Sequence, residues 1–261
     1  MFARITRGAM ALLFLMGGLL LGSGSAHAQA EDGAGSGATL WRTGDRDGAV
    51  RAWTEALAAA DAPAAERARL AYNLGIAAHR ADDPLLAIAW FTACLRIDPR
   101  HHDARANLAI ARTDAGLEDV DGGGPASAAL GWARRYTRSE AEWLAVLGGV
   151  LLLAGGLLEA FRGRPARIAL VLGAAVQPVM WAPLAVAIAS DVPDAHMVVE
   201  PRGLLVYPMP EPGTDKVGKL AAGDVVEALD ELPGWRKVRF QGEERWVRAS
   251  GLAPLDLDPG L

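Results

Sequence analysis

The side chains best suited to metal or acid–base chemistry adjoin at one place in this sequence, where His101 and His102 precede Asp103. Imidazole and carboxylate groups bind zinc, but two adjacent rings leave an incomplete coordination sphere. We therefore interpret these residues as a solvated loop between helices. The single cysteine, Cys94, excludes an intramolecular disulfide and a cysteine-based zinc site, and its position among small apolar residues predicts a packing role.

Motifs that carry catalysis are missing from the sequence. Its mature part has no GxSxG elbow, no Walker phosphate loop and no HExxH zinc motif, and its five histidines are scattered. We expect a protein that is not an enzyme and that needs no metal ion or other cofactor. The net charge of −5 gives no electrostatic reason to expect nucleic acid as a partner, because nucleic-acid binders usually carry a basic face.

A helical repeat offers a binding site instead. Residues 68–101 resemble a tetratricopeptide repeat in their length of 34 residues and in their pattern of small side chains. Gly75 and Ala87 are small enough for two antiparallel helices to approach, Phe91 fills the space between them, and Pro99 ends the second helix.

The repeat extends in both directions. Residues 44–57 match the second half of the same unit, and residues 102–112 match the first helix of a further one. That makes two repeats and a capping helix. Because three repeats are the usual minimum for a freestanding array, we expect this one to lean on the membrane or on a partner.

Two asparagines mark the predicted groove of this array. Asn73 and Asn107 are 34 residues apart and fall at the same place on successive first helices. The resemblance implies that this concave face holds extended peptides or partner helices and that asparagine can bond a peptide backbone there. Asparagine is also common at this place whatever a family member binds. The predicted protein-binding groove consists of Arg69, Tyr72, Asn73, Ile76, His79, Arg80, Asn107 and Ile110.

After Ser190 the apolar period changes from helical to two. The strand candidates are residues 196–200, 203–207, 216–220, 224–229, 235–240 and 245–248. About 60 residues of short strands predict a small all-β barrel. The order of Gly203–Tyr207, Leu220–Val226, Gly234–Val238 and Arg245–Val247 resembles a bacterial SH3-like domain. The sequence departs from that pattern at Arg245, where a glycine usually precedes the last tryptophan.

Three aromatic residues are candidates for an SH3-like binding surface, namely Tyr207, Trp235 and Trp246. Their rings could stack on an extended peptide or a glycan. A barrel this small needs large side chains for its core, so we expect both tryptophans inside it together with Phe240. Tyr207, which Pro208 follows, is the better candidate for an exposed contact.

Two strongly apolar runs, residues 143–161 and 168–190, precede the barrel. Each is long enough to cross a bilayer core about 30 Å thick as a helix. No ionisable side chain lies between residues 144 and 158 or between 168 and 190, whereas a soluble helix of that length would show a polar face. We predict a transmembrane hairpin in which Gln177 faces the first helix; a buried soluble pair is the alternative.

The N-terminus sets the topology of that hairpin. Arg4 and Arg7, a short apolar run and an A-x-A site predict a cleaved secretory signal peptide. An uncleaved anchor is the alternative and gives the same topology. Export then places both soluble arms outside the cytoplasmic (inner) membrane of a bacterium. The basic link between the spans, residues 162–167, stays inside, as the positive-inside rule expects.

We therefore predict a multidomain fold with an all-α tetratricopeptide repeat array, a two-helix transmembrane hairpin and an all-β SH3-like barrel. The predicted boundaries are a signal peptide at 1–30, repeats at 39–116, a Gly-rich linker and juxtamembrane helix at 117–142, the hairpin at 143–190 and the barrel at 195–255. The juxtamembrane helix is expected over residues 126–142, where its aromatic side chains suit the membrane interface.

This order of parts resembles the BatE-like members of the aerotolerance (Bat) operon family over nearly the whole mature chain. The resemblance implies membrane protein partners of the von Willebrand factor A type and a part in stress tolerance. Our first hypothesis is a non-enzymatic scaffold or adaptor of the bacterial envelope, anchored in the lipid bilayer. The alternative is an envelope sensor whose SH3-like domain binds peptidoglycan or another extracytoplasmic ligand.

Reporter fusions test the predicted topology. Fusions at residues 120 and 258 should be active only as extracytoplasmic reporters, and a fusion at residue 165 only as a cytoplasmic one, because two spans return the chain to the exported side. A cytoplasmic signal from either arm would contradict the prediction.

Overall fold

The computed structural model describes residues 35–59, 62–117, 131–162, 164–211 and 213–257. The predicted signal peptide and most of the Gly-rich linker lie outside the described residues, and so do the side chains of the basic link. The chain divides into two compact units, residues 1–66 and 67–261.

The first unit is helical over residues 35–43 and in α3 (Arg46–Ala58). The Asp45 carboxylate accepts a hydrogen bond from the Gly48 N–H and so caps the first turn of α3. Trp53 is 3 % exposed, and its ring lies 5.6 Å from that of Trp41. The half-repeat predicted at residues 44–57 is therefore a helix with its large side chain buried.

Three further helices follow in α4 (Ala64–Arg80), α5 (Pro84–Ile97) and α6 (His102–Asp114). Asp83 caps α5 through the Leu86 N–H, and Pro84 occupies the first turn, where it costs no helical hydrogen bond. Phe91 is fully buried, and a Cβ added to Gly75 would come within 2.6 Å of its ring. The close approach predicted for Gly75 and Phe91 is confirmed.

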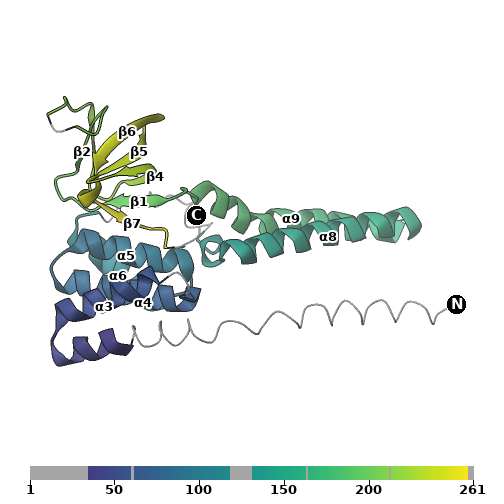
Figure 1. Ribbon diagram of the computed structural model, residues 1–261. Coiled ribbons are helices and arrows are strands. Elements are labelled where there is room, and N and C mark those ends of the chain that lie inside the picture. Colours follow the sequence, from purple (N-terminus) through teal and green to yellow (C-terminus); the bar gives the residue numbers. More distant parts are fainter. Residues whose placement is uncertain (1–34, 60–61, 118–130, 163, 212, 258–261) are drawn as a thin grey trace. The chain divides into compact units, whose positions relative to one another are not determined.

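The apolar runs form two long helices, α8 (Arg138–Arg162) and α9 (Arg164–Ser190), which lie side by side in Figure 1. Both are long and apolar enough to cross a membrane, and most of their side chains that the structure describes are exposed. A core helix of a soluble protein would be mostly buried, so the exposure favours the membrane anchor. As predicted, Gln177 faces the first helix: its Nε2 donates to the Gly148 carbonyl at 2.7 Å.

The structure differs from the sequence prediction at the start of α8 and at the start of α9. The first five residues of the juxtamembrane helix expected over 126–142 lie outside the described residues, and the rest divides into a 3-10 turn at Ala133–Arg135 and the start of α8. A reciprocal capping box sets that start: the Thr137 N–H donates to the Glu140 carboxylate at 3.0 Å, and the Glu140 N–H donates to the Thr137 hydroxyl at 3.3 Å. The second helix begins four residues before its apolar run, because α9 starts at Arg164 and so includes most of the basic link.

The C-terminal domain consists of antiparallel strands β1 (Ala195–Val198), β2 (Leu204–Val206), β3 (Gly218–Leu220), β4 (Val225–Leu232), β5 (Trp235–Phe240), β6 (Glu243–Arg248) and β7 (Leu252–Pro254). Five strands form one sheet in the order β6-β5-β4-β1-β7, and β2 pairs with β3. The six predicted strands are present. Strand β7 was not predicted.

The core of this domain consists of small and medium aliphatic side chains. Val198, Leu204, Val206, Leu220, Val226, Val238 and Val247 are buried together. Phe240 packs against this cluster from its edge. Trp246 is half-buried and lies outside it, which corrects the expectation that both tryptophans fill the core.

The helices of the second unit pack against the strands. A single apolar cluster contains Phe91 and Cys94 of α5 together with Met197 of β1, Ala253 of β7 and Leu255. Figure 1 shows β7 beside α5. We predicted that the short array would lean on a membrane or a partner, and it leans on a domain of its own chain.

Replacing Phe91 with alanine should reduce the free energy of unfolding by about 3–5 kcal/mol, because it removes a fully buried ring and leaves a cavity beside Gly75. Ile110→Ala is the matched control, since Ile110 is 51 % exposed and should lose no more than about 0.5 kcal/mol. Denaturant titration of the full chain in detergent micelles measures both. Equal losses would contradict this packing.

Candidate functional site

Helices α4 and α6 carry the predicted groove. The Asn107 Nδ2 donates to the Tyr72 hydroxyl at 3.3 Å, and the His79 Nε2 lies 2.8 Å from an oxygen of Asp114. Both pairs span 35 residues, so α4 and α6 lie side by side and in register. The second contact lies two turns further along each helix than the first.

Tyr72 lies where three helices meet. Its ring is 6.0 Å from that of Phe91 and 4.8 Å from that of His101. Burial, followed by the negative charge of Asp103, raises the pKa of the Tyr72 hydroxyl, so this group stays protonated and can donate a hydrogen bond. The hydrogen bond between Tyr72 and Asn107 therefore holds α4 and α6 together. It uses one N–H donor of Asn107, which leaves the other for a ligand.

Of the other predicted groove residues, three are exposed to solvent and two are partly buried. Ile110 is 51 % exposed, Arg69 and Arg80 are also exposed, and Ile76 packs against the apolar cluster. Asn73 is half-buried, and its side chain makes no hydrogen bond with the residues that the structure describes. Asp114, the partner of His79, was not predicted. It follows His79 by 35 residues, close to the predicted repeat length of 34, and that spacing could have pointed to it.

The histidine pair does not form the loop that the sequence suggested. His101 caps α6, because its Nδ1 accepts a hydrogen bond from the Ala104 N–H at 3.2 Å. His102 and Asp103 belong to the first turn of α6, where both side chains are exposed. The described residues contain no group of three side chains placed to hold a metal ion.

Cys94 lies in the apolar cluster, fully buried. Burial, with a smaller effect from the Asp98 carboxylate, raises the pKa of its thiol from 9.0 to about 12. A thiol with this pKa is protonated at physiological pH and is a poor nucleophile.

The aromatic residues of the predicted SH3-like surface lie at one place. Tyr207 and Trp246 exchange two backbone hydrogen bonds of 2.8 Å, which tie the β2–β3 ribbon to β6. The Tyr207 and Trp235 rings meet edge to face at 5.4 Å, and the Arg248 guanidinium lies 4.0 Å from the Trp235 ring centre. Trp235 is 6 % exposed, so a ligand would not reach it and its role is to pack beneath Tyr207. Tyr207 and Trp246 are partly exposed.

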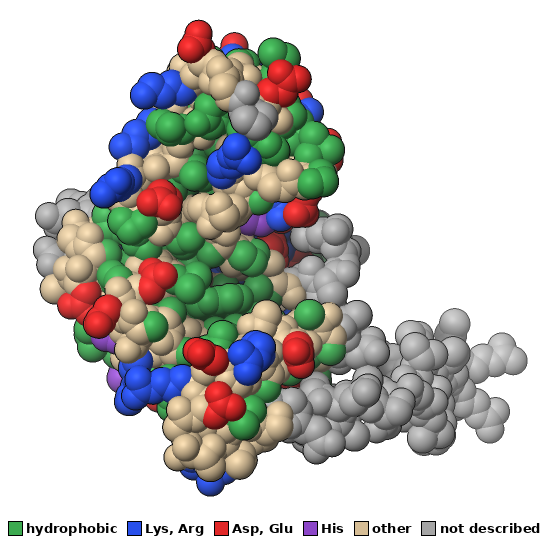
Figure 2. Space-filling model, turned by 60° about the vertical axis from the view of Figure 1, so that its left-hand side comes forward, with side chains coloured by type: hydrophobic (Ala, Val, Ile, Leu, Met, Phe, Trp, Pro, Cys, Tyr) green, Lys and Arg blue, Asp and Glu red, His purple; other side chains and the backbone are tan. Residues whose placement is uncertain are grey.

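Charged side chains surround these aromatic rings. Lys237 lies 5.3 Å from the Trp246 ring centre and is paired with Glu244 at 3.2 Å. Acidic and basic side chains are interspersed over the face drawn in Figure 2. A ligand here would meet the aromatic rings, Lys237 paired with Glu244, and the Arg248 guanidinium over the Trp235 ring.

The bacterial SH3 domain family matches residues 211–253, so this part of the chain is a bacterial SH3 domain. The match begins after β2 and reaches into β7. No curated protein and no solved structure matches the chain. The repeats and the Bat family stay predictions from the sequence.

Native Cys94 should resist alkylation. At pH 8 the buried thiol is protonated, so iodoacetamide should modify the folded chain at least tenfold more slowly than the chain in denaturant, as mass spectrometry can measure. The raised pKa also predicts a stability contribution that is complete below about pH 9 and is lost as the pH rises toward about 12. Equal rates in both states would show that the thiol is exposed.

Proposed function

We propose that this chain is a non-enzymatic scaffold of the bacterial envelope, anchored by α8 and α9, that binds protein partners through the tetratricopeptide groove and the SH3 domain. Membrane proteins of the von Willebrand factor A type, within a Bat complex, are the partners that the family resemblance suggests. A bacterial SH3 domain suggests a protein- or peptidoglycan-binding role, and two apolar helices suggest a membrane anchor.

The observation that carries the proposal is a set of charged contacts, the junction charges: Arg96, Arg100, Arg138, Glu140, Asp191 and Asp256. Arg96 of α5 donates to the Val192 carbonyl and the Asp256 carboxylate, each at 3.5 Å. Those two acceptors lie just before β1 and just after β7. One side chain thus joins the helices to both ends of the strand domain.

The remaining junction charges reach the membrane helices. Both terminal nitrogens of Arg100 bond the Glu140 carboxylate near the start of α8, at 3.0 and 3.1 Å. Arg138 pairs with Asp191, which directly follows α9. Exposed pairs of this kind each contribute little stability, but a paired arginine fixes orientation. The groove and the SH3 domain are thereby held at one end of the hairpin.

This arrangement suits a scaffold. Two binding surfaces on a common anchor raise each other's effective concentration for a partner in the same membrane, so that modest individual affinities combine. A partner protein would contact the groove through residues that solvent reaches, among them Asn73 and Ile110.

A specific observation also supports the sensor alternative. Tyr207 and Trp246 are partly exposed beside each other and are held by two backbone hydrogen bonds. Rigid aromatic rings of this kind suit sugar or peptide stacking. In that function the junction charges would pass a change in the SH3 domain to α8 and α9.

Site-specific photo-crosslinking in intact cells tests the scaffold. A photoreactive residue at Ile110 should trap membrane proteins, and Asn73→Ala should reduce that yield several-fold, because a backbone contact in the groove is lost. A photoreactive residue at Asp82, exposed on the turn between α4 and α5, is the control and should trap none of them.

The outcomes separate the two functions. Identical trapped proteins at Ile110 and Asp82, or none at Ile110, would contradict the groove. Peptidoglycan trapped by a photoreactive residue at Tyr207, with no protein trapped at Ile110, would favour the sensor.

A further inference from the structure

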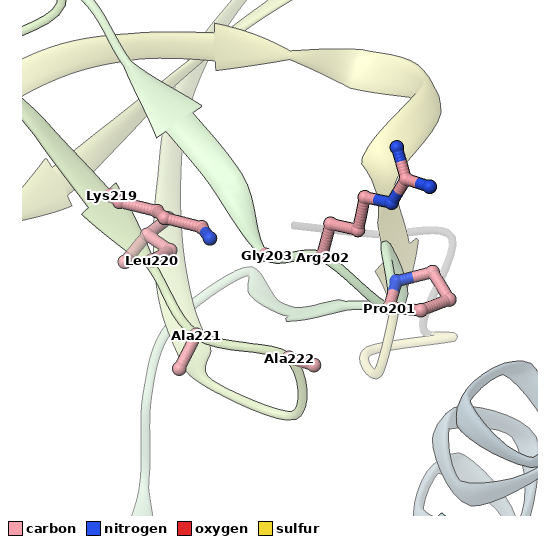
Figure 3. Close-up of a pocket in the computed structure, with 7 residues that line it drawn as sticks. All are labelled: Pro201, Arg202, Gly203, Lys219, Leu220, Ala221 and Ala222. Carbon is pink, nitrogen blue, oxygen red and sulfur yellow. The ribbon is translucent and has the colours of Figure 1, made fainter.

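A pocket at one end of the SH3 domain lies outside the surfaces discussed above. Its volume is about 280 Å³, and it is lined by residues 201–203, which follow β1, and by residues 219–222 at the end of β3. Figure 3 shows Arg202 and Lys219 rising from these two segments on either side of Gly203. Tyr207 lies at the opposite end of β2, so the pocket is separate from the aromatic surface.

Four cations on β5 and β6 are already paired with carboxylates. Arg236 pairs with Glu231, Lys237 with Glu244, Arg239 with Glu227 and Arg245 with Glu243. Arg202 and Lys219 form no ion pair or hydrogen bond with any described residue. Both positive charges line the same pocket, and a guanidinium and an ammonium group can each bond an oxygen of a carboxylate or phosphate.

The backbone around the pocket is fixed in advance. The Gly203 N–H donates to the Glu200 carbonyl at 2.8 Å, and the Ala221 N–H donates to the Asp224 carboxylate at 2.7 Å. Gly203 has φ +72°, and an added Cβ would overlap the Leu220 carbonyl oxygen, so only glycine fits this approach. A preorganised site loses little entropy when it binds.

The remaining walls of the pocket are apolar. Leu220 is 4 % exposed, and the methyl groups of Ala221 and Ala222 with the Pro201 ring complete the lining. At roughly 30 Å³ per water molecule, the volume accommodates roughly nine non-hydrogen atoms. An inorganic anion would leave most of these apolar walls exposed to water. A ligand that carries an anionic group next to a small apolar side chain would cover them.

We propose that this pocket binds the free carboxylate end of a peptide whose last side chain is small, with Arg202 and Lys219 holding the carboxylate. The methyl group of the last residue contacts Ala221 and Ala222. Membrane phosphate is a poorer fit, because a phosphate group has no small apolar side chain to cover Ala221 and Ala222.

Calorimetric titration of the full chain in nanodiscs of neutral lipid tests this. The probe is N-acetyl-Gly-Ala-Ala with a free carboxylate, compared with its C-terminal amide and with inorganic phosphate. The amide should bind at least tenfold more weakly. Arg202→Gln and Lys219→Gln should each weaken the acid about tenfold, because each removes a charge-assisted contact.

Lys216→Gln is the matched control, since Lys216 is exposed between β2 and β3 but outside the pocket, and it should bind as the unchanged chain does. Absence of binding to the unchanged chain, equal affinity for acid and amide, or an equal loss in Lys216→Gln would overturn the proposal. So would phosphate that binds as tightly as the peptide. Crosslinking at Ile110 does not depend on this pocket, so the scaffold proposal and this one fail separately.

Discussion

The contact between α5 and the end strands of the SH3 domain is the constraint on which the second unit depends. One apolar cluster forms its interior and contains Phe91 and Cys94 of the helix together with Met197, Ala253 and Leu255. Arg96 closes the edge of this contact through the Val192 carbonyl and Asp256. Because α9 leads directly into β1, anything that fixes the strands against α5 also fixes the end of the hairpin.

A short helical array gains stability from that contact. Each helix pair buries only one face within its own repeat, and a few repeats leave an apolar side without a neighbour. Here β1 and β7 supply the neighbour, and fully burying a side chain such as Leu255 contributes about 1.5–3 kcal/mol. The groove face of α4 and α6 stays available, because the strands contact α5.

The sequence predicted helices and strands well where the pattern was long and periodic. Phe91 and Gly75 meet as their spacing indicated, and Gln177 bonds the first membrane helix at Gly148. The prediction from the sequence failed where a few side-chain contacts, and not the apolar pattern, set the boundary of an element. The capping box of Thr137 and Glu140 begins α8 five residues before the apolar run, and its S/T-x-x-E signature was visible but was passed over for an amphipathic helix.

Composition and period alone determined the order of parts, because apolar runs without charge, a repeat of about 34 residues and a later period of two are local properties of the chain. Only the tertiary structure decided which surfaces are occupied. Asn107 turned out to bond Tyr72, Trp246 to lie at the rim of the strands, and Arg202 and Lys219 to share a pocket. Those outcomes depend on residues far apart in sequence that meet only when the strands and helices pack, and no local pattern encodes such a meeting.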